Sequence, residues 1–229
     1  MNEYLKMLRE KRMTLIMSLP ANDPRLCRAA FEAGADAVKV HINVDHRASG
    51  THFGRLAEER AALEEMLESR KGPMGLVLGG SLEGVALDVR EAGKLPFAFH
   101  SVYAHHLPAW AMEARGKAAL MAAANVDYTP EMIAAMPAAG TDVLEASVIP
   151  GAEYGAALSM RDLILYRQIA GSVDIPVVVP TQRAIRPEEV SLMAGIGVRG
   201  LMIGAVVTGK TEHSIGAAVE AFRKAIDAL

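Results

Sequence analysis

Short apolar runs alternate with longer helical stretches along the chain, and this rhythm occurs eight times in 229 residues. Strands separated by helices pair in parallel, because each helical crossover returns the chain to the same end of the sheet. Eight such repeats favour closure into a barrel, and this chain length is ordinary for one. We therefore predict an α/β protein with a (β/α)8 TIM-barrel fold, formed as one domain by residues 1–229. The expected strands cover residues 14–20, 37–44, 74–79, 97–103, 118–125, 142–149, 175–181 and 200–207.

Helical segments separate these strands and follow the last one. They are expected at residues 24–34, 54–70, 82–92, 160–170, 187–195 and 213–229, with a short helix from Pro130. A further helix at residues 2–12 has no strand before it, and we expect it to cover the bottom of the barrel. The alternative is an open doubly wound sheet. It is disfavoured because no G-x-G-x-x-G follows the first strand and the rhythm continues evenly to the last residues.

Composition and charge narrow the possible partners. The net charge of −3 gives no reason to expect nucleic acid or an anionic membrane. No run approaches the roughly 18 apolar residues of a membrane span, and the charged N-terminal segment does not read as a signal peptide. The single cysteine, Cys27, excludes an internal disulfide and fits a reducing compartment. We expect a cytoplasmic protein that pairs into a homodimer, as barrels of this class often do.

Polar residues enter the second strand on one face only. Lys39, His41 and Asn43 alternate there with the aliphatic residues at positions 38, 40 and 42. Side chains on a strand point alternately to its two faces, and the aliphatic face should meet the surrounding helices. Lys39, His41 and Asn43 are therefore predicted to point into the barrel.

The sixth strand behaves in the same way, with Glu145 and Ser147 on one face. A lysine and a glutamate directed into one barrel are costly to bury unpaired. Lys39 and Glu145 are therefore expected to form an ion pair, which is either structural or part of an acid–base site.

Six of the seven histidines, at positions 41, 46, 52, 100, 105 and 106, fall at or after the ends of the second and fourth strands. Histidine suits proton transfer near neutral pH and also binds divalent metals. Their concentration favours a site, and His100 of the fourth strand joins His41 as a candidate catalytic residue.

The loops after the sixth, seventh and eighth strands are predicted to bind an anion. In many barrels the loops after the last two strands hold a phosphate together with the start of a short extra helix. Glycines that permit a close backbone approach occur here at Gly151 and Gly204, followed by Ala205. Gln182 and Arg183 follow the seventh strand, and Arg183 would add a bidentate donor.

Three short motifs stand at the ends of the second, sixth and eighth strands. They are His41-Ile42-Asn43-Val44 with a later Phe53-Gly54, Val148-Ile149-Pro150-Gly151, and Met202-Ile203-Gly204-Ala205-Val206. These motifs resemble the ribulose-phosphate-binding barrel superfamily, and most closely its ribulose-phosphate 3-epimerase branch. The resemblance implies a small phosphorylated sugar as the substrate.

The chain departs from the metal site of those epimerases, which hold a divalent metal with two histidines and two proton-transferring aspartates. His41 matches one histidine, but Asn43 and Gln182 stand where the aspartates are expected. A neutral amide is a weak metal ligand and cannot act as a general base. More loosely similar barrels include N-acylmannosamine-6-phosphate epimerases and those of tryptophan biosynthesis, several of which work without metal. We therefore expect neither metal nor another cofactor.

These observations predict a metal-independent isomerase, epimerase or carbon–carbon lyase that acts on a small phosphorylated sugar or related carbonyl metabolite. Lys39 would serve as an electrostatic partner, an acid or a Schiff-base nucleophile. His41 or His100 would be the general acid or base, and Glu145 the complementary base or orienting group. The predicted substrate-binding residues are Asn43, Ser147, Gly151, Gln182, Arg183, Gly204 and Ala205.

Two alternatives remain open at this point. A metal enzyme could hold zinc or manganese with His41, His100 and either His105 or His106. A non-catalytic barrel could bind a metabolite or a partner, because a barrel fold does not by itself imply catalysis.

Overall fold

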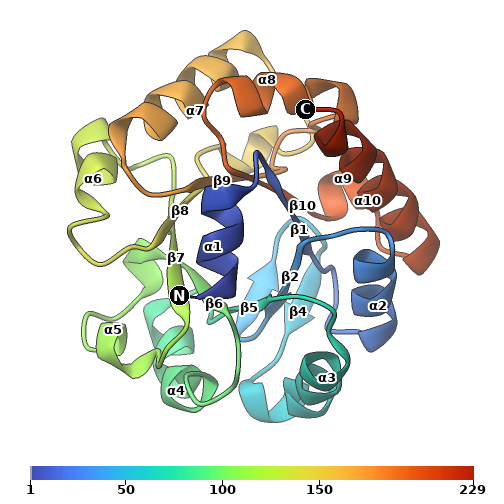
Figure 1. The fold of residues 1–229 in the computed structure, drawn as a ribbon. Coiled ribbons are helices and arrows are strands. Elements are labelled where there is room, and N and C mark those ends of the chain that lie inside the picture. Colours follow the sequence, from blue (N-terminus) through green and yellow to red (C-terminus); the bar gives the residue numbers. More distant parts are fainter. Residues whose placement is uncertain (1) are drawn as a thin grey trace.

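Eight parallel strands close into a barrel in the computed structural model, which describes residues 2–229. The strands follow one another around the barrel in the order β1-β10-β9-β8-β7-β6-β5-β2, and β2 pairs with β1 to close the ring. Helices surround the ring, so the predicted TIM-barrel fold is confirmed (Figure 1). The barrel strands are β1 (Thr14–Ser18), β2 (Ala37–His41), β5 (Met74–Val77), β6 (Phe99–Tyr103), β7 (Ala119–Ala124), β8 (Val143–Ala146), β9 (Val177–Pro180) and β10 (Gly200–Ile203).

The second strand ends earlier than the alternation of its residues predicts. Asn43 has a positive φ of 54°, which turns the chain out of the extended conformation. The chain then forms an antiparallel hairpin, β3 (Val44–His46) and β4 (Thr51–Phe53), although no strand was predicted after residue 44 in this segment. This hairpin, which we call the β3–β4 hairpin, stands beyond the end of β2.

The helices occupy the segments between the strands, with three single turns of 3-10 helix in the loops. Helix α2 (Pro24–Glu32) begins at Pro24 with Asp23 as its N-cap residue, as the sequence predicts. The helices are α1 (Glu3–Glu10), α2 (Pro24–Glu32), α3 (Leu56–Ser69), α4 (Leu82–Ala92), α5 (Ala111–Ala114), α6 (Pro130–Ala135), α7 (Met160–Ser172), α8 (Val190–Gly195), α9 (Ala205–Thr208) and α10 (Glu212–Asp227), and the 3-10 turns are η1 (Ala104–His106), η2 (Gly151–Glu153) and η3 (Pro187–Glu189).

Helix α1 covers one end of the barrel, as predicted, and lies across the middle of the ring in Figure 1. Its Tyr4 and Leu8 are fully buried and pack into the barrel interior. The Tyr4 ring stacks on Phe99 of β6, with the ring centroids 4.0 Å apart. Because this end is filled by apolar side chains, a ligand can enter only from the opposite end.

Alternation along each strand separates two apolar layers. Ile16, Phe99 and Met121 belong to the interior cluster that also holds Tyr4. Residues one position away, such as Leu76 and Leu120, belong to the larger layer between the strands and the helices. A polar residue can therefore be assigned to the interior or to the helix-facing layer from its strand position alone.

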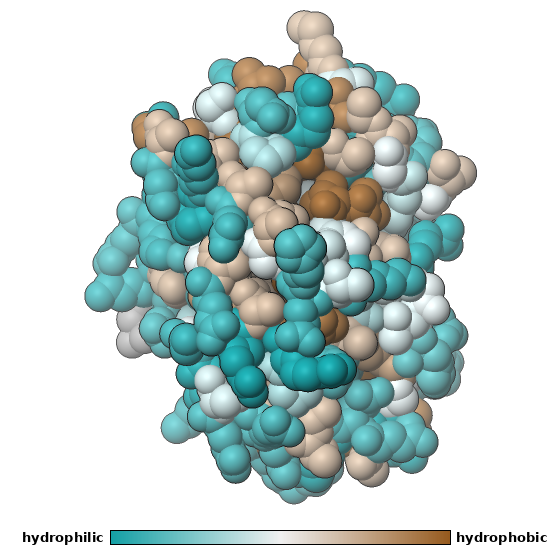
Figure 2. Space-filling view, turned by 90° about the vertical axis from the view of Figure 1, so that its right-hand side faces the viewer, coloured by the Kyte–Doolittle hydropathy of each residue, from teal (hydrophilic) through white to brown (hydrophobic). Residues whose placement is uncertain are grey.

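The outer surface is mixed. The side that carries α2 and α10 is covered mainly by hydrophilic side chains with smaller hydrophobic patches between them (Figure 2). No helix within residues 2–229 has the length and apolar character to cross a membrane. The predicted homodimer stays a prediction.

Candidate active site

A cavity of about 460 Å³ opens at the end of the barrel opposite α1. This volume lies in the usual range of small-molecule pockets. In barrels of this fold, the carboxyl ends of the strands are where active sites form. All eight barrel strands contribute a lining residue here, namely Ser18, Lys39, Val77, Ser101, Ala123, Glu145, Pro180 and Met202.

Lys39 and Glu145 form the predicted ion pair inside this cavity. The Lys39 Nζ atom lies 3.5 Å from Glu145 Oε2, and both side chains are 7% exposed. The lysine comes from β2 and the glutamate from β8, which stand opposite each other in the ring. The pair therefore spans the full width of the barrel interior.

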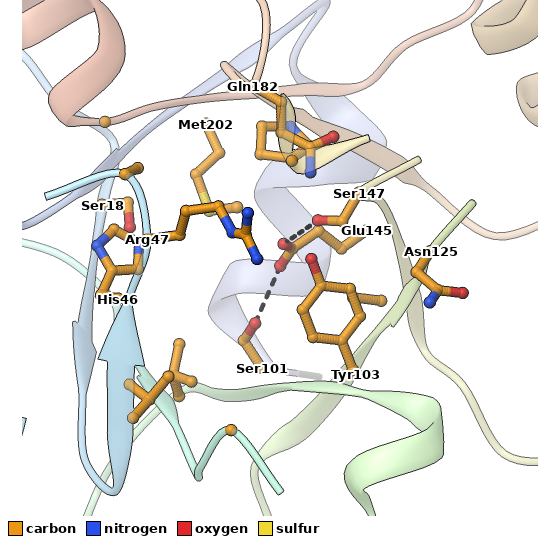
Figure 3. A pocket seen from close by; sticks show the side chains of 18 of the residues that line it. Ser18, His46, Arg47, Ser101, Tyr103, Asn125, Glu145, Ser147, Gln182 and Met202 are labelled. Atoms are coloured by element: carbon orange, nitrogen blue, oxygen red, sulfur yellow. Dashed lines mark hydrogen bonds between the residues drawn. The ribbon is translucent and has the colours of Figure 1, made fainter. Parts of the chain in front are cut away.

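Two serine hydroxyls fix the Glu145 carboxylate. Ser101 Oγ donates to Oε2 at 2.9 Å, and Ser147 Oγ donates to Oε1 at 2.7 Å (Figure 3). The carboxylate thus accepts one hydrogen bond on each oxygen, and Lys39 adds an ion pair on the Oε2 side. An ammonium group carries three N–H donors, so Lys39 can also donate to a ligand in the cavity. Ser147, predicted to bind substrate, lines the cavity and also orients the glutamate.

His41 is buried beside this pair and lines the cavity, as predicted. Its Nε2 lies 3.5 Å from Ser18 Oγ, and its ring packs on Phe53 of the β3–β4 hairpin with the centroids 4.6 Å apart. Burial, with smaller contributions from nearby His46 and Lys39, holds the pKa of His41 well below its usual value. The imidazole is therefore neutral near pH 7 and offers one donor and one acceptor.

His46 of the β3–β4 hairpin also lines the cavity. Burial is the main cause that lowers the pKa of His46 to about 4, and Lys39 adds to it. Its Nδ1 lies 2.8 Å from Ser49 Oγ, which fixes the ring within the hairpin.

An aromatic wall formed by Tyr103, His105 and His106 closes another side of the cavity. The ring centroids of His105 and His106 are 4.3 Å apart, and that of Tyr103 is 5.2 Å from His105. Burial is the largest cause that raises the pKa of Tyr103, whose hydroxyl contacts Ser147. The rings of this wall are suited to packing against the faces of a ligand.

Gln182 braces the loop after β8. Its Oε1 accepts from the backbone N–H of Ile149 at 3.0 Å, and its Nε2 donates to the Tyr154 hydroxyl at 2.6 Å. The side chain lines the cavity, but its polar atoms already hold this loop. Gln182 therefore holds in place the loop that carries Gly151, which lines the cavity.

Arg183 is turned away from the cavity, which corrects the expectation that it receives the anion. Its guanidinium lies 2.5 Å from Glu153 Oε2 and 3.0 Å from Asp162 Oδ1. The side chain is 8% exposed and is absent from the residues that line the cavity. Two carboxylates use its charge, so Arg183 is a structural link between the β8 loop and α7.

His100 is also outside the cavity, contrary to its predicted catalytic role. It pairs in register with Leu76 and Leu120, which face the helices, whereas its neighbour Ser101 faces the interior. Burial, followed by the charge of Arg115, lowers the pKa of His100 to about 4. The alternation that sends Ser101 inward requires His100 to point outward.

Asn43 likewise lies outside the cavity. Its Nδ2 donates to Asp88 Oδ2 at 3.0 Å, and its backbone N–H donates to the Gly54 carbonyl at 2.8 Å. The positive φ breaks the alternation that would have directed it inward beside His41. Asn43 therefore fixes the base of the β3–β4 hairpin instead of contacting a substrate.

The predicted anion cup is partly recognisable after β10. Gly204 lines the cavity, and its backbone N–H donates to Thr181 Oγ1 at 3.0 Å. Helix α9 starts at the next residue, Ala205, which gives the expected short extra helix after the last strand. The first N–H groups of a helix have no partner within it. Gly151, in the loop after β8, also lines the cavity.

The cavity residues that were not predicted as site residues include Ser18, Arg47 and Ser101. Ser18 and Ser101 share the inward parity of their strands, and this signal was readable from the sequence. Arg47 comes from the turn of the β3–β4 hairpin, which no apolar alternation announces.

No group of three or more His, Cys, Asp and Glu side chains within residues 2–229 comes together as a metal site. The histidine trio considered above is not assembled, because His100 lies behind the strands while His41 lies in the cavity. His52 is exposed on the hairpin, with its Nδ1 2.7 Å from Asp45 Oδ1.

No known family model matches the chain, and no curated protein matches it in sequence. Many solved structures share its fold. Tryptophan synthase from Mycobacterium tuberculosis is 18% identical with a TM-score of 0.72 over 96% of each chain. Thiamine phosphate pyrophosphorylase from Pyrococcus furiosus is 18% identical with a TM-score of 0.66, over 95% of this chain and 97% of that one. A candidate fructose-1,6-bisphosphate aldolase from Coccidioides immitis is 14% identical with a TM-score of 0.68, over 99% of this chain and 95% of that one. These similarities establish the barrel fold, and the epimerase branch stays a prediction.

Proposed function

We propose that the chain is an enzyme that moves a proton next to the carbonyl group of a small phosphorylated metabolite, without a metal ion. The observation that carries this proposal is the Lys39–Glu145 pair inside the cavity at the carboxyl ends of the strands. An acid and a base of opposite charge, held side by side and open to one cavity, are the minimum that such chemistry requires.

Each member of the pair has a distinct role. The free N–H groups of Lys39 donate to the substrate carbonyl oxygen and stabilise the negative charge that develops there. Glu145 removes a proton from the adjacent carbon and returns it. Ser101 and Ser147 hold its carboxylate at a fixed angle. Positioned acid–base groups of this kind contribute roughly 100- to 10,000-fold to a rate.

His41 supports this chemistry as a neutral group. Its depressed pKa excludes an imidazolium near pH 7, so it can donate or accept a hydrogen bond but brings no charge. Its Nδ1 is buried and has no hydrogen-bond partner within the described chain. The Ser18 hydroxyl beside Nε2 orients the ring.

The phosphate is supported by the turn from β10 into α9, with Gly204 and the backbone N–H groups that follow it. Two of the structural neighbours carry a phosphate compound in their names, thiamine phosphate and fructose-1,6-bisphosphate. Isomerisation, epimerisation and carbon–carbon cleavage all pass through a carbanion next to a carbonyl group, so the same pair serves each of them.

The test is exchange of the proton next to the carbonyl group, measured by NMR in D2O with a chelator present, across a panel of ketose and triose phosphates. We expect exchange with at least one compound, and a loss of at least 100-fold with Glu145→Gln or Lys39→Met. His100→Leu is the matched control, because this buried histidine faces away from the cavity and should leave exchange intact.

Exchange that survives both substitutions, or that needs an added metal ion, would contradict the proposal. If exchange does depend on Lys39, borohydride reduction during turnover distinguishes two roles of this lysine. A mass increase on Lys39 identifies a Schiff base, whereas an unmodified chain leaves Lys39 as a hydrogen-bond donor.

A further inference from the structure

Only two lysine or arginine side chains of the described chain line the cavity, Lys39 and Arg47. Lys39 is paired with Glu145, whereas no ion pair or hydrogen bond within residues 2–229 involves the Arg47 guanidinium. This contrasts with Arg183, whose two carboxylate partners use its charge outside the cavity. The cavity thus holds a guanidinium with a forked set of N–H donors and no ion pair within the described residues, since the second lining carboxylate, Asp45, contacts His52 on the exposed hairpin instead.

Arg47 reaches across the mouth of the barrel. It leaves the β3–β4 hairpin beyond β2, and its guanidinium lies against Gly151 in the loop after β8. A methyl group at Gly151 would overlap this guanidinium, so glycine is required for the close approach. Strands β2 and β8 are opposite in the ring and also carry Lys39 and Glu145. Arg47 therefore reaches from the β2 side of the barrel to the loop after β8, and Figure 3 shows its side chain extending from the hairpin into the pocket.

Hydrogen bonds hold the hairpin backbone that carries Arg47, although none within the described residues involves the Arg47 guanidinium. Lys210 Nζ donates to the carbonyl of Ser49, which ties the hairpin to the segment just after α9. Ser49 Oγ also contacts His46 Nδ1 at 2.8 Å. A cation on a fixed backbone, with no protein partner and open to a cavity, is prepared to bind an anion.

We infer that Arg47 binds the phosphate of the substrate. Together with the proposed function, on which this step rests, the geometry defines the substrate class further. The carbonyl group must reach the Lys39–Glu145 pair while the phosphate stays at the mouth with Arg47. The substrate is therefore a carbonyl compound with a terminal phosphate, standing along the barrel axis. The guanidinium fork can meet two phosphate oxygens at once, which a lysine cannot do.

The test uses inorganic phosphate as the probe, so it does not depend on the reaction. Calorimetric titrations compare the unaltered chain with Arg47→Met, Arg47→Lys and Gly151→Ala. The control is Arg186→Met, since Arg186 is an exposed arginine that pairs with Glu189 outside the cavity. We expect the dissociation constant for phosphate to rise roughly 10- to 100-fold in Arg47→Met, the usual worth of a hydrogen bond to a charged group.

The other variants should weaken phosphate binding to different degrees. Arg47→Lys should raise the dissociation constant less than Arg47→Met does, and Gly151→Ala should also raise it because the added methyl group displaces the guanidinium. Arg186→Met should leave it unchanged. A dissociation constant within twofold of the unaltered value in Arg47→Met, or no phosphate binding by the unaltered chain, would overturn the inference.

The proton-exchange assay keeps this inference separate from the proposed function. For an active substrate, Arg47→Met should raise KM at least tenfold and change kcat much less. Phosphate binding that depends on Arg47 without any proton exchange would leave the anion site standing and refute the reaction. Proton exchange with an unchanged KM in Arg47→Met would support the proposed reaction and refute the anion site.

Discussion

His100 is a buried histidine whose replacement should make the protein more resistant to acid. Its side chain is fully buried between the strands and the helices, and neither ring nitrogen has a hydrogen-bond partner within the described chain. The pKa of His100 is lowered from 6.5 to about 4, chiefly by burial. The unfolded chain therefore binds a proton here below about pH 6.5, while the folded protein stays neutral until about pH 4.

The sign and size of the effect follow from this difference in proton binding. As pH falls from 6.5 towards 4, the proton stabilises only the unfolded chain, so the folded protein loses stability. The loss attributable to His100 is about 0.2 kcal/mol at pH 7 and about 2 kcal/mol at pH 5. His100→Leu removes it, and also removes two buried ring nitrogens without partners, worth roughly 1–3 kcal/mol at any pH.

Urea titrations at pH 7 and pH 5 measure the free energy of unfolding of both proteins. His100→Leu should be at least as stable at pH 7, and its advantage should grow by about 2 kcal/mol at pH 5, a shift of roughly 1 M in the urea midpoint. His213→Gln, a change at an exposed histidine, is the control and should give no such growth. An advantage of equal size at both pH values would refute the reasoning.

Three further predictions concern charged residues. Lys39→Met should lower the free energy of unfolding by roughly 3–5 kcal/mol because it strands the buried Glu145, and adding Glu145→Leu should recover most of that loss in urea titrations. Asn43→Asp introduces the aspartate that the epimerase branch has at this point, but the new carboxylate would lie beside that of Asp88, whose Oδ2 is 3.0 Å from Asn43 Nδ2 in the unaltered chain; we expect a lower Tm and no bound metal by elemental analysis. Arg183→Met should cost about 3–5 kcal/mol because it strands the buried Asp162 carboxylate; because it also loosens the loop that carries Gly151, it should weaken phosphate binding in calorimetry, by less than Arg47→Met does.

The barrel could be predicted because its strands carry their own signal. Each is a short apolar run followed by a helix, and all eight predicted runs contain a barrel strand. Even the alanine-rich run at residues 118–125, whose composition also suits a helix, forms β7 (Ala119–Ala124). Its place between two neighbouring strands outweighs the helical propensity of alanine.

The Lys39–Glu145 pair could be predicted for the same reason, since alternation directs both residues inward. The same rule applied to the fourth strand places Phe99, Ser101 and Tyr103 inward and His100 outward. The error at His100 came from weighing a residue type, histidine, above its position in the strand. Parity was the better guide to the site.

The remaining errors arise where the chain leaves regular structure. Asn43 adopts a positive φ, which ends the extended conformation, so the inward and outward alternation of the second strand no longer applies from this residue on. The partners of Arg183 lie 30 and 21 residues away, at Glu153 and Asp162. Nothing local in the sequence distinguishes an arginine that is paired in this way from one that awaits an anion.

Gln182 and Arg183 follow β9, and their contacts hold the loop after β8 in place. Gln182 holds the backbone of Ile149, and Arg183 holds Glu153, so together they brace both sides of Gly151. A braced Gly151 gives the Arg47 guanidinium a fixed surface to lie against. The polar residues after β9 and the cation from the β3–β4 hairpin are thus two parts of one arrangement. If Arg47 binds the phosphate, loosening the brace with Gln182→Ala should weaken phosphate binding although Gln182 itself never touches the anion.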